Sequence, residues 1–197
     1  MFQGASAFNN GDAPGDSNNP LNWDTGLVNT MLNMFHSATV FNQDITNFSV
    51  VSVTTMKGMF KGAAAFNNGQ PALQSGAPLN NWNTSNVTSL YETFQDAGSF
   101  NQDLGEWDVS NVTEFQRTFR QDGGLMRFDR DISTWCVEHL TDAGKRVDFN
   151  NGATTPIRAD YLPKWGESCG ARVILTDSDG DNKFTDAETA IITATFN

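Results

Sequence analysis

The stretch SFNQDLGEWDVSNVTEFQRTF, residues 99–119, spaces single large apolar residues evenly among Asn, Gln, Asp and Ser. Three other stretches carry the same marks: AFNNGDAPGDSNNPLNWDTGLVNTMLNMF, VFNQDITNFSVVSVTTMKGMF and AFNNGQPALQSGAPLNNWNTSNVTSLYETF. The phenylalanines recur in step, because the spacing from Phe35 to Phe60 equals that from Phe94 to Phe119. The chain therefore contains an internal repeat of about 25 residues. A unit of this length is too short to bury an apolar face alone.

Two of the steps are longer. The step from Phe2 to Phe35 and the step from Phe60 to Phe94 each hold an extra segment rich in Gly and Pro. These segments, at 12–19 and 69–78, predict surface loops. Stacking of about five units would join their scattered apolar residues into one continuous core.

Each unit predicts a short strand followed by a helix. Val112, Phe115 and Phe119 stand at i, i+3 and i+7, and these offsets recur in three other units, which is typical of a helical stripe. The preceding EWDVS and NWNTS alternate apolar and polar residues, which is typical of a strand with one buried face. The sequence predicts an α/β solenoid over residues 1–135, a right-handed coil like that of leucine-rich repeats, with about five 25-residue strand–helix units.

The repeat decays after Trp135, where the only two cysteines, Cys136 and Cys169, occur. A solenoid needs a cap over its last layer, so we predict that residues 136–170 form a C-terminal cap held by a disulfide. The alternative is a redox or metal-binding pair, which the wide separation of the two cysteines, without a further Cys or a suitable His, disfavours. A disulfide implies an oxidising, extracellular location.

Composition and motifs narrow the class of function. The formal net charge of −11 argues against nucleic acid or an anionic membrane as a partner, and it favours cation binding. No apolar run is long enough to span a membrane. No catalytic motif of the GxSxG, Walker or HExxH type occurs, and neither His36 nor His139 has a neighbouring nucleophile. We expect no enzyme activity and no catalytic residue, although composition alone leaves a paired-carboxylate glycosidase open.

The segment DSDGDNKFTDAE, residues 177–188, fits the pattern of a calcium-binding loop. Ca²⁺ binds six to eight hard oxygen atoms around a tight turn. The predicted ligands are Asp177, Asp179, Asp181, Lys183 through its backbone carbonyl, and Glu188. The flanks ARVILT and TAIITATFN are strand-like, so residues 171–197 are predicted to be a Ca²⁺-binding linker at the start of a further β domain. The alternative is an acidic, turn-rich linker.

Two rows of polar residues follow the repeat. The first row comes directly after an inward Phe, and its members are Asn9, Asn42, Asn67, Asn101 and Asp129. It predicts an internal ladder that pairs turn backbone groups from unit to unit, with a ligand-contacting row as the alternative. The second row, here the outward row, lies on the exposed face of the predicted sheet, and its members are Asn22, Asp24, Asn47, Ser49, Asn81, Asn83, Glu106 and Asp108. The outward row is our candidate ligand-binding face, with a plain solvated surface as the alternative.

The units MFKGAAAFN, FNQDLGEWDVSNVT and WNTSNVTSL, closed by WCV and PKWGESC, resemble the BspA-like family of bacterial surface leucine-rich-repeat proteins over about residues 1–169. The chain departs from that pattern at Phe48, where Trp is usual, and at Thr93 and Thr118, where Met is usual. The calcium loop resembles the joints before immunoglobulin-like repeats in large adhesins of the repeats-in-toxin class.

These resemblances imply a non-catalytic adhesion module of a large adhesin on the bacterial cell surface. Its expected partner is a protein or another cell-surface ligand, including a second copy of the chain in a homodimer, and neither nucleic acid nor an inserted membrane. Two alternatives remain open, a peptide- or glycan-binding module for host or algal surfaces and a structural spacer without a ligand.

Overall fold

The computed structural model describes residues 2–13, 19–71, 78–122, 124, 127–152 and 157–169, together with the backbone of two strands beyond them. Three short 3₁₀ helices occur: η1 (Pro78–Asn81), η2 (Ala143–Arg146) and η3 (Ala159–Tyr161). The strand-like flanks of the calcium loop form β1 (Arg172–Thr176) and β2 (Ile191–Thr195), which pair antiparallel with Arg172 opposite Thr195. Among the described residues, no helix is long and apolar enough to cross a membrane.

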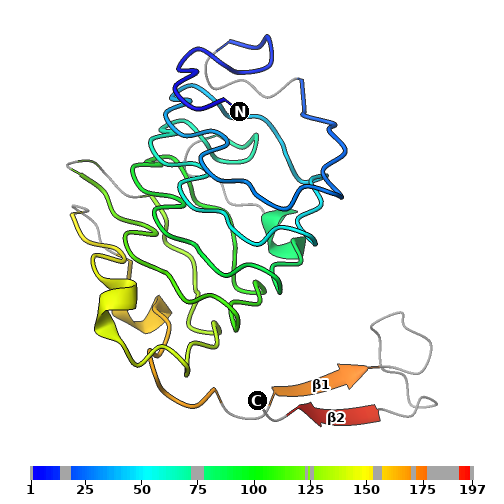
Figure 1. The fold of residues 1–197 in the computed structure, drawn as a ribbon, viewed down its shortest axis with the longest axis vertical. Coiled ribbons are helices and arrows are strands. Elements are labelled where there is room, and N and C mark those ends of the chain that lie inside the picture. Colours follow the sequence, from blue (N-terminus) through cyan, green and yellow to red (C-terminus); the bar gives the residue numbers. More distant parts are fainter. Residues whose placement is uncertain are drawn as a thin grey trace.

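The repeats follow one another as stacked coils of chain, which Figure 1 shows from the N-terminal end in blue to the yellow end. We number them by residues 2–30 (coil 1), 31–55 (coil 2), 56–89 (coil 3), 90–114 (coil 4) and 115–140 (coil 5). Backbone amides join each coil to the next. Phe35 donates to the carbonyl of Met59 at 2.8 Å, and Phe60 donates to that of Thr93 at 2.9 Å.

The predicted α/β solenoid is wrong. The described residues contain no α-helix, and their only strands, β1 and β2, lie outside the repeats. Each coil is instead a run of turns closed by hydrogen bonds between residues three apart. In coil 2 the amide of Met34 donates to the carbonyl of Met31, and the amide of Ala38 donates to that of Phe35. Consecutive turns therefore place apolar residues at i and i+3, the spacing that the sequence shares with a helix.

Left-handed residues interrupt both helix and strand in the repeats. Asn33 stands two positions before Phe35, and Glu92 stands two positions before Phe94. Their φ angles are 52° and 56°. Gly58 holds the equivalent place at 61°. A residue with positive φ cannot continue an α-helix or an extended strand, so the β-pairing between neighbouring described coils is limited to isolated bridges such as the parallel pair Thr30 and Thr55.

Aromatic columns run through the stacked coils and form the core. The first column holds Phe2, Phe35, Phe60, Phe94 and Phe119, and the second holds Phe8, Phe41, Phe66, Phe100 and Phe128. Neighbouring ring centroids within these columns lie 5.4–5.9 Å apart. The two rings of one coil lie 3.9–4.3 Å apart. In a third column, Trp107 stacks between Trp82 and Trp135 at 6.1 and 6.4 Å, so residues isolated in sequence become one apolar interior.

The predicted asparagine ladder is confirmed. The Oδ1 atom of Asn9 accepts the backbone N–H of Asn42 at 2.9 Å, and Asn42 accepts that of Asn67 at 2.7 Å. The series continues from Asn67 to Asn101 at 2.9 Å and from Asn101 to Asp129 at 3.0 Å. Each side chain thus supplies the acceptor for a backbone group that the adjacent coil buries.

The two threonines that depart from the family pattern also join coils. Thr93 and Thr118 are fully buried. Their Oγ1 atoms donate to the carbonyls of Met56 and Leu90 in the preceding coils, each at 3.1 Å. At these positions the threonine hydroxyl therefore forms a hydrogen bond between coils, which the usual methionine could not form.

The segment after coil 5 ends the aromatic stack, and the predicted disulfide between Cys136 and Cys169 is confirmed with Cα atoms 5.4 Å apart. Phe149 meets Phe119 edge-on, at 5.4 Å and 82°, and Trp165 meets Phe115 at 5.4 Å and 77°. Because these rings turn by nearly a right angle, they cover the last layer instead of offering a face for another one.

Candidate functional site

The outward row keeps its exposure although the predicted sheet is absent. All its side chains are exposed except Ser49, which is half-buried. Between Glu106 and Asp108 the Trp107 side chain is only 2% exposed, so the alternation read from the sequence persists without a strand. The row therefore extends over coils 1 to 4 on one side of the aromatic core.

Several acceptors of the outward row close local turns. Asp24 Oδ1 accepts the N–H of Gly26 at 3.0 Å, and Asp108 Oδ1 accepts the N–H of Ser110 at 3.0 Å. Asn83 Oδ1 accepts from Ser85 in the same way at 3.2 Å. These bonds hold the side chains in fixed directions through their Oδ1 atoms. Ligand binding by this row stays a prediction.

The five predicted calcium ligands, Asp177, Asp179, Asp181, Lys183 and Glu188, lie outside the residues that the structure describes, so calcium binding stays a prediction. Within the described residues, Cys136, Glu138 and Cys169 lie close enough together to hold a metal ion. The two sulfur atoms are bonded to each other, and a disulfide offers no thiolate to a metal.

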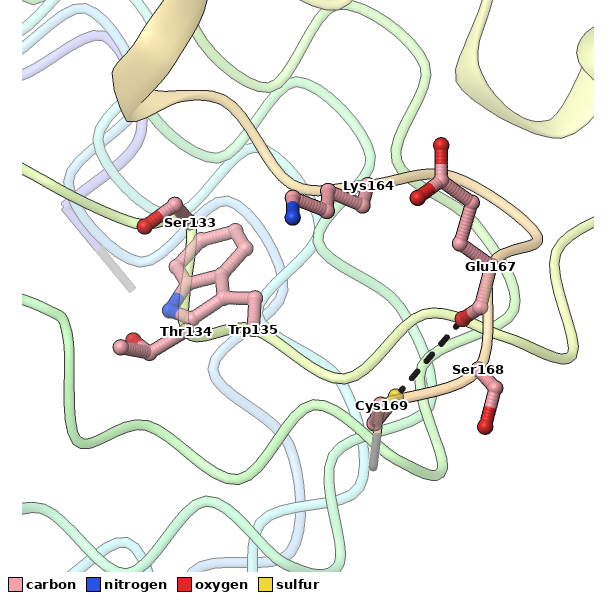
Figure 2. Close-up of a pocket in the computed structure, with 7 residues that line it drawn as sticks. All are labelled: Ser133, Thr134, Trp135, Lys164, Glu167, Ser168 and Cys169. Atoms are coloured by element: carbon pink, nitrogen blue, oxygen red, sulfur yellow. Dashed lines mark hydrogen bonds between the residues drawn. The ribbon is translucent and has the colours of Figure 1, made fainter. Parts of the chain in front are cut away.

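A cleft of about 330 Å³ opens where coil 5 faces the C-terminal segment. Figure 2 shows Ser133, Thr134 and Trp135 on the coil side, and Lys164, Glu167 and Ser168 on the other side. Cys169 closes one edge, where its Sγ atom lies 4.0 Å from the carbonyl oxygen of Glu167. The disulfide therefore fixes the two walls of the cleft relative to each other.

Polar contacts fix the coil wall of the cleft. The Trp135 side chain is 3% exposed, and its Nε1 atom donates to the carbonyl of Leu104 at 2.8 Å. Thr134 Oγ1 donates to the carbonyl of Gly105 at 2.7 Å. No sequence motif indicates this cleft, although the predicted disulfide joins its two walls, which backbone bonds from Ile132 to Tyr161 and from Gly166 to Val137 also connect at 3.0 and 3.1 Å.

Comparison with protein families gives an assignment for most of the chain. Residues 1–77 and 69–157 each match the family described as Mycoplasma protein of unknown function, DUF285. The chain belongs to this family. The match is consistent with the resemblance to BspA-like surface proteins and, together with the disulfide, indicates an extracellular DUF285 protein. Searches of curated proteins and of solved structures found no match.

A network of charged side chains crosses the coils of this DUF285 chain on another side. Glu92 accepts from Lys61 Nζ at 2.6 Å and from Arg117 Nη1 at 3.3 Å. Arg120 continues the series, with its Nη1 atom 2.6 Å from Asp148 Oδ2. The Glu92 side chain is 13% exposed, so this carboxylate is well shielded from water. Alternating charges join coils 3, 4 and 5 to the C-terminal segment.

Glu92→Gln is expected to lower the free energy of unfolding by about 1 kcal/mol at pH 7. Partial burial opposes ionisation of Glu92, but the hydrogen bond and charge of Lys61, followed by those of Arg117, outweigh it and hold the pKa below its ordinary value of 4.5. A carboxyl whose pKa is depressed by folding stabilises the fold above its unfolded pKa, and this contribution is lost as pH falls through the folded pKa.

Urea unfolding of wild type and Glu92→Gln over a pH series from neutral to acid checks this expectation. The stability difference should shrink as the pH falls below the ordinary pKa of Glu92. Asp160→Asn is the matched control, since the Arg158–Asp160 pair is exposed and its loss should leave unfolding unchanged. A stability difference that is constant with pH would contradict the network as the cause.

Proposed function

We propose that the chain is a non-catalytic adhesion module displayed on a bacterial cell surface, and that the outward row makes its protein–protein or cell–cell contacts. The observation that carries this proposal is the row itself, a continuous set of exposed polar side chains on a stack held together from within. The DUF285 match and the disulfide support a surface location.

Rigidity makes the outward row suitable for recognition. Thr25 Oγ1 donates to the carbonyl of Ser49 in the next coil at 2.9 Å, and Thr84 donates to that of Asp108 at 2.9 Å. Such bonds tie members of the row to neighbouring coils, so a partner does not have to order the surface when it binds. Asn side chains both donate and accept hydrogen bonds, which also allows the same row of a second copy to pair with it.

The net charge of −11 opposes contact between two copies unless cations reduce the repulsion. A Ca²⁺ ion bound at the predicted loop 177–188 would lower the net negative charge of each copy. Pairing of two copies is therefore the version of the proposal to test first.

Light scattering after size-exclusion chromatography, with Ca²⁺ and with a chelator, tests self-pairing. We expect a concentration-dependent dimer in Ca²⁺ that weakens about tenfold or more when Asn47→Asp and Asn81→Asp add like charges to the row. Asn29→Asp, on an exposed side chain outside the row, is the matched control. If the chain is a monomer in every condition and binds nothing on peptide and glycan arrays, the proposal is wrong and the chain is a structural spacer.

A further inference from the structure

We propose that the cleft between coil 5 and the C-terminal segment binds one unit of a neutral, polyhydroxylated ligand, which is the chemistry of a saccharide. Such a site goes beyond the outward row, because the cleft shares no residue with it. Its support is the size of the cleft, the charges on its rim and the rigidity of its walls.

The size of the cleft limits the ligand. Small-molecule sites in proteins usually measure about 300–1,000 Å³, and the cleft lies at the lower end of that range with about 330 Å³. One ring-sized unit fits this volume, whereas an oligomer would have to extend out of it. The ligand we expect is therefore a single sugar, or one end of a chain whose remainder stays in solvent.

The charges on the rim favour a ligand that donates and accepts hydrogen bonds at adjacent atoms. Lys164 and Glu167 both line the cleft, and among the described residues neither side chain has an ion-pair partner. The ammonium of Lys164 can only donate and the carboxylate of Glu167 can only accept, while vicinal hydroxyl groups do both. The two opposite charges sum to zero, so the cleft has no net preference for an anionic or a cationic ligand.

Both walls add hydroxyl groups. Ser133 and Ser168 lie on opposite sides of the cleft region in Figure 2, and the indole of Trp135 lies between them. That indole is only 3% exposed and stacks on Trp107, so the polar side chains of the cleft make the contacts with the ligand. Because the Cys136–Cys169 disulfide joins residues next to both walls, ordering of the site costs little when a ligand binds.

NMR titration of the isotope-labelled chain tests the proposal. Neutral hexoses, N-acetylhexosamines and hexuronic acids are added in turn, and the chemical shifts of the amide and indole groups are followed. We expect saturable shifts at residues 133–135 and 164–169 for a neutral sugar, with a dissociation constant on the order of 1 mM. Lys164→Met and Glu167→Gln should each weaken binding about tenfold, because each removes hydrogen bonds to a charged group.

Two controls separate the cleft from the rest of the molecule. Lys57→Met removes an exposed lysine that stacks on Tyr91 far from the cleft residues in sequence, and Asn29→Asp alters an exposed side chain of coil 1 outside the outward row. Both should bind as the wild type does, and an unchanged urea midpoint confirms that each cleft variant is folded. Binding that persists in both Lys164→Met and Glu167→Gln overturns the proposal, and so does saturation by a free amino acid but by no sugar.

Discussion

Phe60→Ala is expected to destabilise the fold by about 3–5 kcal/mol, the range for removal of a buried phenyl ring. Phe60 is fully buried. Its ring lies 3.9 Å from that of Phe66 within coil 3, and 5.8 and 5.6 Å from those of Phe35 and Phe94 in the coils on either side. Removal of the ring opens a hole in the middle of the first aromatic column.

The coils cannot close that hole easily. Backbone bonds on both sides of Phe60 fix the distance between coils 3 and 4, since Phe60 donates to Thr93 at 2.9 Å and Gly62 donates to Gln95 at 2.7 Å. The cost should therefore approach the upper part of the range, because the cavity term depends on how far a site can collapse.

Urea unfolding measures the effect of Phe60→Ala against two other variants. Phe8→Ala lies in coil 1, where the ring is only half-buried, and should cost clearly less. Leu27→Ala removes a side chain that is 96% exposed and should change stability by less than about 0.5 kcal/mol. Equal losses for Phe60→Ala and Phe8→Ala would show that burial within the stack does not set the cost of removing a ring.

Asn67→Ala is expected to cost about 2–5 kcal/mol, although it removes no apolar side chain. Its Oδ1 atom accepts the backbone N–H of Asn101 at 2.9 Å and the Nε2 of Gln102 at 2.8 Å. All three residues are buried. Alanine would leave both donors with fewer acceptors away from water, and a buried unsatisfied donor costs about 1–3 kcal/mol.

Asn81→Ala is the matched control for Asn67→Ala, because Asn81 is an exposed asparagine of the outward row in the same coil. The melting temperatures of the two variants should differ by several degrees, and their free energies of unfolding in urea should differ by about 2–5 kcal/mol. Hydrogen exchange offers a second readout, since the amide of Asn101 should lose protection in Asn67→Ala alone. Full protection of that amide would contradict the ladder.

The register of the core follows from the sequence, while the type of local structure does not. Phe35, Phe60, Phe94 and Phe119 could be aligned by counting, and Asn67 could be placed in a ladder because a buried backbone needs acceptors. The offsets i, i+3 and i+7 are ambiguous, since successive turns closed over three residues produce them as well as a helix does.

A glycine signal for turns is present on both sides of the central Phe in coil 3 alone among the described repeats. Gly58 and Gly62 stand two positions before and after Phe60, and both have positive φ angles, 61° and 68°. Coil 1 has Gly4 two positions after Phe2, at 73°, whereas coils 4 and 5 have non-glycine residues at the position before the Phe, Glu92 at 56° and Arg117 at 58°. Stacking of the neighbouring coils imposes a left-handed conformation there that local preference does not indicate. The cysteine pairing could be predicted, but the cleft could not, because it also depends on the path of the chain between the two cysteines, which the repeat does not specify.

The disulfide also decides how the chain would carry tension. Cys169 stands three residues before β1, and Cys136 lies within coil 5. A pull on the chain beyond Cys169 passes straight through the sulfur bridge to the end of the stack. The cysteines are 33 positions apart in sequence, or about 12 nm of extended chain, and the pull bypasses this segment, so that Phe149 and Trp165 stay packed on the last aromatic layer. Under reducing conditions the same pull would peel that cover away first, and so expose Phe115 and Phe119.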